Sequence, residues 1–202
     1  IGSQDHAAVP GLLQRLESGE SVASAMPRAL ADAPCWTPPA DALVDHTRAF
    51  FKVQDGCDAR CSYCIIPTAR GPGRSIPFDE ALARLAALGA AHAEVVMAGI
   101  HLGTYGRDLE PRRSLSELVE ATAARELVRR IRLSSIEPLE FPLGLLRGPA
   151  AAHLCDHFHV PLQSGSSRIL AGMRRPYRAE QYRGVIESIA AAAPGACIGA
   201  DV

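Results

Sequence analysis

The feature that most constrains this chain is a group of three cysteines within eight positions. Cys57, Cys61 and Cys64 follow the spacing Cys-x3-Cys-x2-Cys and make up half of the six cysteines in 202 residues. Disulfide pairing fits this group poorly, because an odd number leaves one thiol over and nothing marks the chain as secreted. A structural zinc ion would need four protein ligands, and no fourth ligand lies within the usual local spacing.

An iron–sulfur cluster suits three cysteines when one iron has to stay open. A cubane [4Fe–4S] cluster has four irons, and four thiolates normally hold them. With only three thiolates, the remaining iron can bind a small molecule through an amine and a carboxylate. The spacing therefore favours a cluster of this kind over zinc or over unliganded cysteines.

From residue 47 onward the chain alternates between expected strands and helices. Strands are expected over residues 49–53, 94–98, 130–134, 157–160 and 196–202. Helices are expected over 79–88, capped by Asp79 and stopped by Gly89, from a capping box at 114–117, and over 179–192, with a short helix at best over 142–146. Repeated βα units of this kind predict an α/β fold whose parallel sheet is closed, or partly closed, into a barrel.

Four loops that follow expected strands are polar or rich in glycine. They are the cysteine loop and residues 99–106, 134–138 and 161–166. In parallel βα folds the functional residues lie in the loops after the C-terminal ends of the strands. The four loops therefore predict a single site at one rim of the sheet.

These segments resemble the methylthiotransferases of the radical S-adenosylmethionine (SAM) class. The first loop of that family is matched by residues 56–67, its Pro-Gln-Ser-Gly-Ser pattern is close to residues 161–166, and its Met-x-Arg-x-Tyr pattern is matched by residues 173–177. Residues 99–103 and 132–138 are most similar to the MtaB branch, which acts on N6-threonylcarbamoyladenosine at position 37 of tRNA. The resemblance covers residues 48–202 and implies a partial radical SAM (β/α) barrel, truncated after about the fifth strand.

The resemblance implies a mechanism and its cofactors. Cys57, Cys61 and Cys64 would hold a [4Fe–4S] cluster whose open iron chelates the amino and carboxylate groups of SAM. One electron from the cluster would release a 5′-deoxyadenosyl radical, which takes hydrogen from C2 of the modified adenine. Sulfur insertion and a methyl group from a second SAM would complete the product. The cofactor supplies the difficult chemistry, and the protein positions it and excludes water.

Seven further residues are candidates for contact with SAM. Tyr63 would lie beside the adenine, Gly99 and Ile100 would offer backbone groups, Ser135, Glu137 and Gln163 would reach ribose or amino groups, and Arg175 would reach the carboxylate. The alternatives are a plain turn at Gly99, hydrogen bonds from Ser135 and Gln163 to loop backbone, and a surface pair between Arg175 and Glu180.

Two other side-chain groups allow more than one interpretation. His153, Cys155, His157 and His159 alternate, which superficially suggests zinc, but the resemblance places the two later histidines inside the barrel near the substrate. A basic stretch could touch tRNA phosphates: Arg168, Arg174, Arg175, Arg178 and Arg183. The alternative is a solvated helix face that Glu180 and Glu187 partly neutralise.

The chain is expected to be a fragment of a longer enzyme. Residues 1–45 would be a remnant of an N-terminal methylthiotransferase domain, with a short amphipathic helix near Leu12–Leu16 and a proline-rich linker, and residues 46–202 an incomplete radical SAM core. The family's N-terminal domain holds a second, auxiliary [4Fe–4S] cluster on three cysteines, whereas only Cys35 precedes the motif here. We expect cluster and weak SAM binding without full activity.

Composition limits the location and partners. The net charge is −1, no run of eighteen apolar residues occurs, and the N-terminus lacks a signal-peptide pattern, so we expect a cytoplasmic protein without a membrane partner. The resemblance implies tRNA as substrate and an electron donor, and the sequence does not tell whether that donor is flavodoxin-like or ferredoxin-like. The rival readings are a methylthiotransferase for isopentenyladenosine in tRNA or for a ribosomal-protein aspartate, and, in another class, a non-catalytic zinc-binding interaction module.

Overall fold

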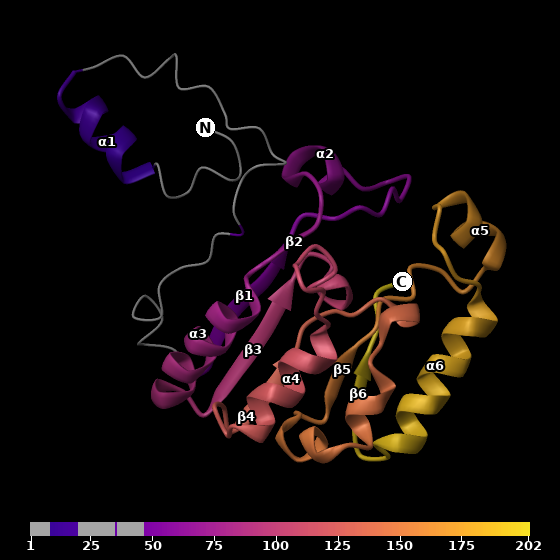
Figure 1. The fold of residues 1–202 in the computed structure, drawn as a ribbon. Coiled ribbons are helices and arrows are strands. Elements are labelled where there is room, and N and C mark those ends of the chain that lie inside the picture. Colours follow the sequence, from indigo (N-terminus) through magenta and orange to yellow (C-terminus); the bar gives the residue numbers. More distant parts are fainter. Residues whose placement is uncertain (1–8, 20–34, 36–46) are drawn as a thin grey trace.

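The computed structural model describes residues 9–19, 35 and 47–202 of the chain (Figure 1). The predicted N-terminal helix is confirmed as α1 (Val9–Glu17), and none of its residues is buried. The proline-rich linker lies outside the described residues except for Cys35, whose side chain packs against the main core.

Six strands and five further helices follow α1 in the part of the chain that the structure describes. The strands are β1 (Ala49–Asp55), β2 (Arg74–Ser75), β3 (Glu94–Gly99), β4 (Arg130–Leu133), β5 (His157–His159) and β6 (Cys197–Gly199). The helices are α2 (Ile66–Arg70), α3 (Phe78–Ala91), α4 (Leu115–Ala124), α5 (Ser167–Gly172) and α6 (Ala179–Ala192). Short 3-10 turns are η3 (Leu102–Thr104), η4 (Pro138–Glu140), η5 (Leu143–Leu146) and η6 (Pro149–His153).

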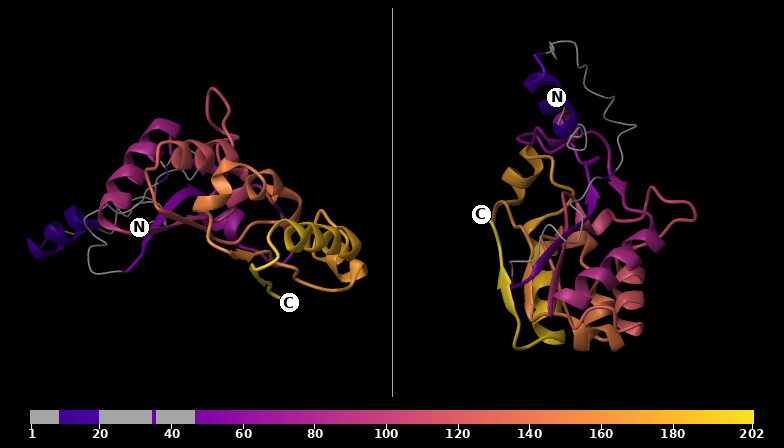
Figure 2. Two further views of the ribbon diagram at one scale, coloured as in Figure 1. Left: turned by 90° about the horizontal axis from the view of Figure 1, so that it is seen from below. Right: turned by 90° about the vertical axis from the view of Figure 1, so that its left-hand side faces the viewer.

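The strands form a curved, open sheet in two hydrogen-bonded parts (Figure 2). The first part has the order β2-β1-β3-β4, with β1, β3 and β4 parallel and β2 antiparallel to β1. The second part is the parallel pair β5 and β6. The two parts are joined where the Cys155 amide donates to the Ile131 carbonyl at 2.9 Å and the Ile136 amide donates to the His159 carbonyl at 3.0 Å. The predicted α/β partial barrel is thus confirmed, and the described strands do not close it.

The core lies between the sheet and the helices that cover one of its faces. Alternate residues of β1, Ala49, Phe51 and Val53, are buried together with the leucine face of α3. This alternation follows from the pleat, which sends successive side chains to opposite faces. On the opposite face Phe50 is 55% exposed. No helix among the described residues has the length and apolar character needed to cross a bilayer.

Gly89 does not end its helix, contrary to the prediction. Helix α3 begins at Phe78, with Pro77 rather than Asp79 as its N-cap, and continues two residues past Gly89 to Ala91. A Cβ atom on Gly89 would lie 1.9 Å from the carbonyl oxygen of Leu127. The glycine therefore lets the segment before β4 pack directly on the helix backbone, a close approach that any side chain would block.

The other boundaries agree with the sequence in most places. Helix α6 spans the predicted residues 179–192, and Ser114 caps α4 by accepting a hydrogen bond from the Glu117 amide at 3.2 Å. The last strand is shorter than predicted, because only residues 197–199 pair with β5. The predictions missed β2, α2 and α5, which are too short to show a clear periodicity.

Candidate functional site

The three-cysteine segment is a closed loop between β1 and β2, at the C-terminal end of the parallel strands (Figure 1). Its neck closes where the Cys57 amide donates to the Gly71 carbonyl at 3.1 Å. Gly56 has a φ of 71°, and a Cβ atom there would lie 1.9 Å from the Pro72 carbonyl oxygen. Only glycine fits this turn, so the residue before Cys57 is fixed by backbone geometry.

Asp55 anchors both sides of the loop from inside the protein. Its side chain is fully buried and lies 2.7 Å from Lys52 Nζ, 3.3 Å from Arg70 Nη1 and 3.7 Å from Arg74 Nη2. It also accepts a hydrogen bond from the Gly56 amide at 2.8 Å. Burial would raise the pKa of Asp55, but the hydrogen bonds from Lys52 and Gly56 and the nearby positive charges hold it below its usual value. The carboxylate therefore stays charged and ties the end of β1 to the return of the loop.

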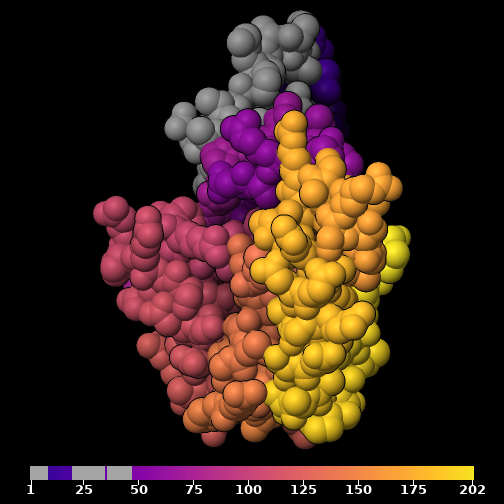
Figure 3. Space-filling view, turned by 90° about the vertical axis from the view of Figure 1, so that its right-hand side faces the viewer, coloured from indigo at the N-terminus to yellow at the C-terminus, as the bar shows by residue number. Residues whose placement is uncertain are grey.

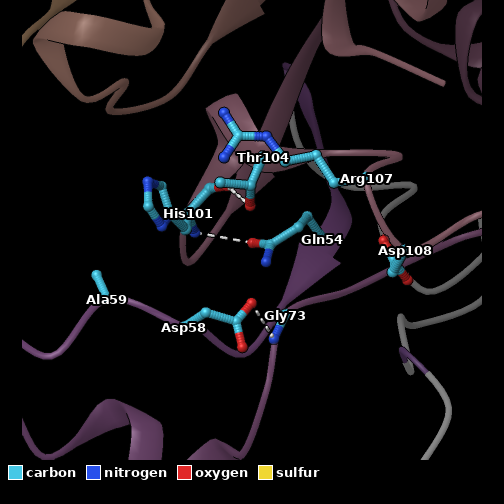
Figure 4. Close-up of a pocket in the computed structure, with 8 residues that line it drawn as sticks. All are labelled: Gln54, Asp58, Ala59, Gly73, His101, Thr104, Arg107 and Asp108. Atoms are coloured by element: carbon cyan, nitrogen blue, oxygen red, sulfur yellow. Dashed lines mark hydrogen bonds between the residues drawn. The ribbon is translucent and has the colours of Figure 1, made fainter. Parts of the chain in front are cut away.

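Gln54 connects the cysteine loop to the loop that follows β3 (Figure 4). Its buried side chain donates to the carbonyls of Asp55 at 3.0 Å and Gly56 at 2.9 Å. Its Oε1 accepts a hydrogen bond from the His101 amide at 2.8 Å. One amide side chain thus fixes two of the four predicted rim loops relative to each other.

His101 lies between a cysteine and a carboxylate. Its Nδ1 is 3.3 Å from Cys57 Sγ, and its Nε2 is 2.6 Å from Glu140 Oε2, although that pair lacks the alignment of a hydrogen bond. Glu140 also binds Arg107 Nη2 at 3.1 Å. Burial alone would lower the pKa of His101, but the contacts with Cys57 and Glu140 raise it to about 10. The imidazolium form is therefore favoured beside Cys57.

A pocket of about 320 Å³ opens beside this contact (Figure 4). Gln54, His101 and Thr104 lie on one side of it, and Asp58 and Gly73 lie on the other. The Asp58 carboxylate accepts a hydrogen bond from the Gly73 amide at 3.2 Å. The pocket follows the cysteine loop from Asp58 to its return strand.

Arg175 makes the corresponding contact at the second cysteine. Its Nη1 donates to Cys61 Sγ at 3.3 Å, and its Nη2 pairs with Glu137 Oε2. The Tyr177 hydroxyl lies 3.2 Å from Nη2 and donates to the Leu162 carbonyl at 3.0 Å. Burial raises the pKa of Glu137, and the charge of Arg175 only partly opposes that rise.

These contacts settle one alternative for Arg175. The predicted surface pair with Glu180 is wrong, because Arg175 turns inward to Glu137 and Glu180 instead accepts a hydrogen bond from Ser167 at 3.2 Å. The cysteine loop is also held from this side, since the Ser62 amide donates to the Met173 carbonyl at 3.1 Å. The segment after α5 is therefore part of the wall around the cysteines.

The three cysteine side chains fit an iron–sulfur cluster in their chemistry. Each is half-buried, and none forms a disulfide. In the described ranges, no three His, Cys, Asp or Glu side chains are close enough to bind one metal ion together. A polynuclear cluster places each thiolate on a different iron, so its ligands stand further apart than those of a single ion. Cationic side chains also lie against two of the three thiols, His101 beside Cys57 and Arg175 beside Cys61.

The remaining predicted site residues are distributed along the same rim. Tyr63 is 54% exposed, and Ile100 is 39% exposed. Gly99 packs closely, since a Cβ there would lie 3.0 Å from the Leu102 Cα and 3.1 Å from the Gln54 Cβ. That packing accounts for this glycine without any ligand.

Two predicted residues lie beside the β5–β6 pair. Ser135 Oγ is 2.6 Å from His159 Nδ1 rather than on loop backbone. Gln163 adopts a φ of 67°, and its amide donates to the Asp201 carbonyl at 2.9 Å. The structure therefore brings Cys61, Glu137 and Arg175 into contact, while Ser135 and Gln163 occupy the neighbouring part of the rim.

The alternating His and Cys residues do not form a shared site. His153 ends the turn η6 and its Nδ1 lies 3.2 Å from the Val128 carbonyl oxygen, whereas Cys155 is buried. His157 and His159 point from the same face of β5.

Sequence reasoning missed the roles of Gln54, Asp55 and Glu140. The only local signal was the pair of polar residues that ends the apolar strand β1.

Comparison with known proteins places these features in a family. The profile described as the Radical SAM superfamily matches residues 51–199, well over half of the chain. The match begins in β1 and ends in β6, so it spans the cysteine loop and every strand of the sheet.

Curated relatives extend the similarity in sequence. Threonylcarbamoyladenosine tRNA methylthiotransferase MtaB of Bacillus subtilis is 37% identical over 163 residues, covering 80% of this chain and 36% of that protein. The protein of the same name from Chlamydia pneumoniae is 40% identical over 158 residues, covering 77% and 37%. The tRNA-2-methylthio-N(6)-dimethylallyladenosine synthase of Parafrankia sp. is 32% identical over 204 residues, covering 100% and 41%. The chain thus spans about two fifths or less of the curated relatives it matches.

Solved structures support the fold. The cobalamin-dependent S-adenosylmethionine radical enzyme OxsB, with aqua-cobalamin and S-adenosylmethionine bound, matches with a TM-score of 0.69 at 14% identity, over 97% of this chain and 32% of that one. The radical S-adenosylmethionine methyltransferase TsrM from Kitasatospora setae matches with a TM-score of 0.67 at 14% identity, over 99% and 44%. At this identity the likeness concerns the fold alone.

Proposed function

The chain belongs to the radical SAM superfamily, and from this premise we propose that it is the catalytic core of a tRNA methylthiotransferase. The proposed product is the 2-methylthio derivative of N6-threonylcarbamoyladenosine at position 37. The observation that carries the proposal is the arrangement of the rim, where one arginine and one histidine from later loops contact two of the three loop cysteines. The names of the relatives supply the substrate class.

Radical SAM enzymes use a [4Fe–4S] cluster and SAM, and we propose that Cys57, Cys61 and Cys64 hold the cluster here. When bound, that pair of cofactors supplies a one-electron reductive cleavage of SAM. The donor set supports this assignment, because three thiols free of disulfides share one loop and two of them lie against cationic side chains.

The chain's own residues would orient the cysteine loop and place charged side chains beside it. Arg175 and His101 place positive charge beside Cys61 and Cys57. Glu137 and Glu140 balance these two cations from the opposite side. Asp55 and Gln54 would hold the loop against the sheet, so that its thiols need little rearrangement on loading.

We propose that SAM lies over the rim between Tyr63 and Glu137. Exposed Tyr63 is available to cover an adenine ring, Gly99 ends the strand β3, and Ile100 follows it. Ser135 and Gln163 would meet the sugar or the amino group from the β5 side. Arg175 is already held by Glu137 and Tyr177, which supports a role in positioning the cysteine loop more directly than a role on the carboxylate of SAM.

The extent of the domain and its location are also proposals. Residues 46–202 would form the radical SAM core of the enzyme, with SAM, a tRNA and an electron donor as its partners. An oxygen-sensitive cluster and an RNA substrate both suit the cytoplasm. The whole reaction belongs to proteins more than twice the length of this chain, so the first test should follow SAM cleavage rather than complete turnover.

The substrate can be tested with two synthetic anticodon stem-loops, one bearing N6-threonylcarbamoyladenosine and one bearing isopentenyladenosine. The chain is reconstituted anaerobically and reduced with dithionite, and 5′-deoxyadenosine is measured by mass spectrometry. We expect the threonylcarbamoyl stem-loop to stimulate SAM cleavage more strongly, and the Cys61→Ala variant to show none. Stronger stimulation by the isopentenyl stem-loop would move the assignment to that branch. Stimulation by neither RNA would contradict a tRNA substrate.

A further inference from the structure

A pocket of about 490 Å³ lies where α5 meets the start of α6, on the face that Figure 3 presents. Arg168, Arg178, Ser167 and Gln181 line it, and Tyr177 and Arg175 form its inner side. The proposed function gives this pocket no role, and the sequence alone left its arginines as either phosphate contacts or a solvated helix face. Its two outer arginines are solvent-exposed, whereas Tyr177 is only 4% exposed.

Positive charge is concentrated around this pocket. Residues 167–183 contain five arginines and one acidic residue, Glu180, although the whole chain carries a net charge of −1. Arg175 is neutralised by Glu137. Within the part of the chain that the structure describes, no carboxylate forms an ion pair with Arg168 or Arg178. Both guanidinium groups therefore remain free to bind an anion.

The pocket is built by hydrogen bonds between the two helices. Ser167 Oγ accepts from the Ala179 amide at 3.0 Å and donates to Glu180 Oε2 at 3.2 Å. Within α6, Gln181 Oε1 accepts from the Arg178 amide at 2.9 Å and caps the start of that helix. These contacts fix the start of α5 against the first turn of α6, and Glu180 is occupied by Ser167. The positions of the two arginines are thus set by the fold rather than by a single flexible loop.

The pocket is also continuous with the cysteine site. Arg175 lines the pocket and donates to Cys61, and the end of α5 contacts the cysteine loop through Ser62 Oγ and the Gly172 carbonyl at 3.1 Å. A polymer with one unit at the cysteine rim therefore has this pocket beside it. The planar guanidinium group of arginine can bind two oxygens of one phosphate, and phosphates repeat along a nucleic acid.

We infer that the α5–α6 pocket binds a backbone phosphate of the RNA substrate, next to the nucleotide that reacts. This inference rests on the proposed function, because it names how the RNA is held beside that site. Arg168 and Arg178 would supply the charge, Ser167 would hold the two helices together, and Gln181 would fix the backbone of Arg178. The contact carries no sequence information and sets the position of the RNA.

The test measures RNA binding as a function of salt, without any need for the cluster. A fluorescein-labelled anticodon stem-loop is titrated with the full 202-residue chain, and anisotropy gives Kd at several KCl concentrations. Arg168→Gln and Arg178→Gln are each expected to lower the slope of log K against log salt by about one. Arg125→Gln, at the C-cap of α4, is the matched control and should leave the slope unchanged. Circular dichroism confirms that each variant folds.

The outcomes separate this inference from the proposed function. If the wild-type chain binds the RNA and both variants keep its slope and affinity, the pocket is not the phosphate site, whereas the proposed function stands. If the wild-type chain binds no RNA at all, both are overturned. Polyglutamate is added as a competitor at matched ionic strength. If polyglutamate and unlabelled RNA compete equally well, the inference is wrong and the pocket binds an acidic protein instead of RNA.

Discussion

Replacing Asp55 by Asn tests how the cysteine loop is held. The substitution keeps the shape of the side chain and removes one fully buried negative charge from among Lys52, Arg70 and Arg74. Removing one partner of a buried ion pair typically costs 3–5 kcal/mol, because the remaining charge loses its compensation. Here the three cationic side chains are 25%, 32% and 10% exposed and can regain water. We therefore expect the low end of that range, about 3 kcal/mol.

Urea unfolding gives the measurement. With a slope of about 2 kcal/mol per molar urea, the midpoint should fall by about 1.5 M in the Asp55→Asn variant. Glu80→Gln is the matched control, because Glu80 pairs with Arg84 at 2.7 Å on the surface of α3, where both side chains are more than a third exposed. Such an i,i+4 pair contributes about 0.3–0.5 kcal/mol, so its midpoint should fall by only about 0.2 M. Equal shifts in the two variants would refute the view that Asp55 is the anchor.

Three further predictions concern other parts of the fold. Gly89→Ala should destabilise the chain by at least about 2 kcal/mol, because its Cβ would meet the Leu127 carbonyl. Gly184→Ala has open space around it and should stabilise α6 by about 0.5–1 kcal/mol. Thermal unfolding in which both variants gain stability would contradict the close contact at Gly89. Ser114→Ala should lose about 1 kcal/mol in urea unfolding through the missing cap on α4, and an unchanged midpoint would contradict that role. Burial would raise the pKa of Glu94, but Arg132 and Arg48 hold it below its usual value, so its stabilisation is complete at neutral pH and is lost as pH falls below about 4.3. The destabilisation of Glu94→Gln should therefore shrink between pH 7 and pH 3, and a constant difference would be inconsistent with the low pKa.

The sequence predicts the elements whose pattern is local. Helix α6 has the predicted bounds because its apolar positions recur at helical spacing over fourteen residues. The parallel sheet follows from repeated βα units, and the cysteine spacing marks the first rim loop. Gly89 shows the limit of local reasoning. A glycine after a leucine face usually ends a helix, and only the approach of Leu127 explains why this one does not.

The contacts within the site could not be predicted in the same way. Arg175 meets Glu137 across 38 positions of sequence, and His101 meets Cys57 across 44. No periodicity encodes such pairs, because they depend on how separate loops meet at the rim after the sheet has formed. The sequence places Arg175 in a basic stretch, yet in the structure its side chain is turned inward and its neighbours Arg168 and Arg178 face solvent.

The assignment of the three cysteines is tested most directly by electron paramagnetic resonance of the anaerobically reconstituted and reduced chain, recorded with and without SAM. We expect a [4Fe–4S] signal that changes when SAM is added and that disappears in the Cys61→Ala variant. Cys197→Ala is the control, because Cys197 is exposed on β6 and outside the cysteine loop, and its signal should be unchanged. A colourless protein that retains zinc, or a cluster signal that is indifferent to SAM, would contradict the account.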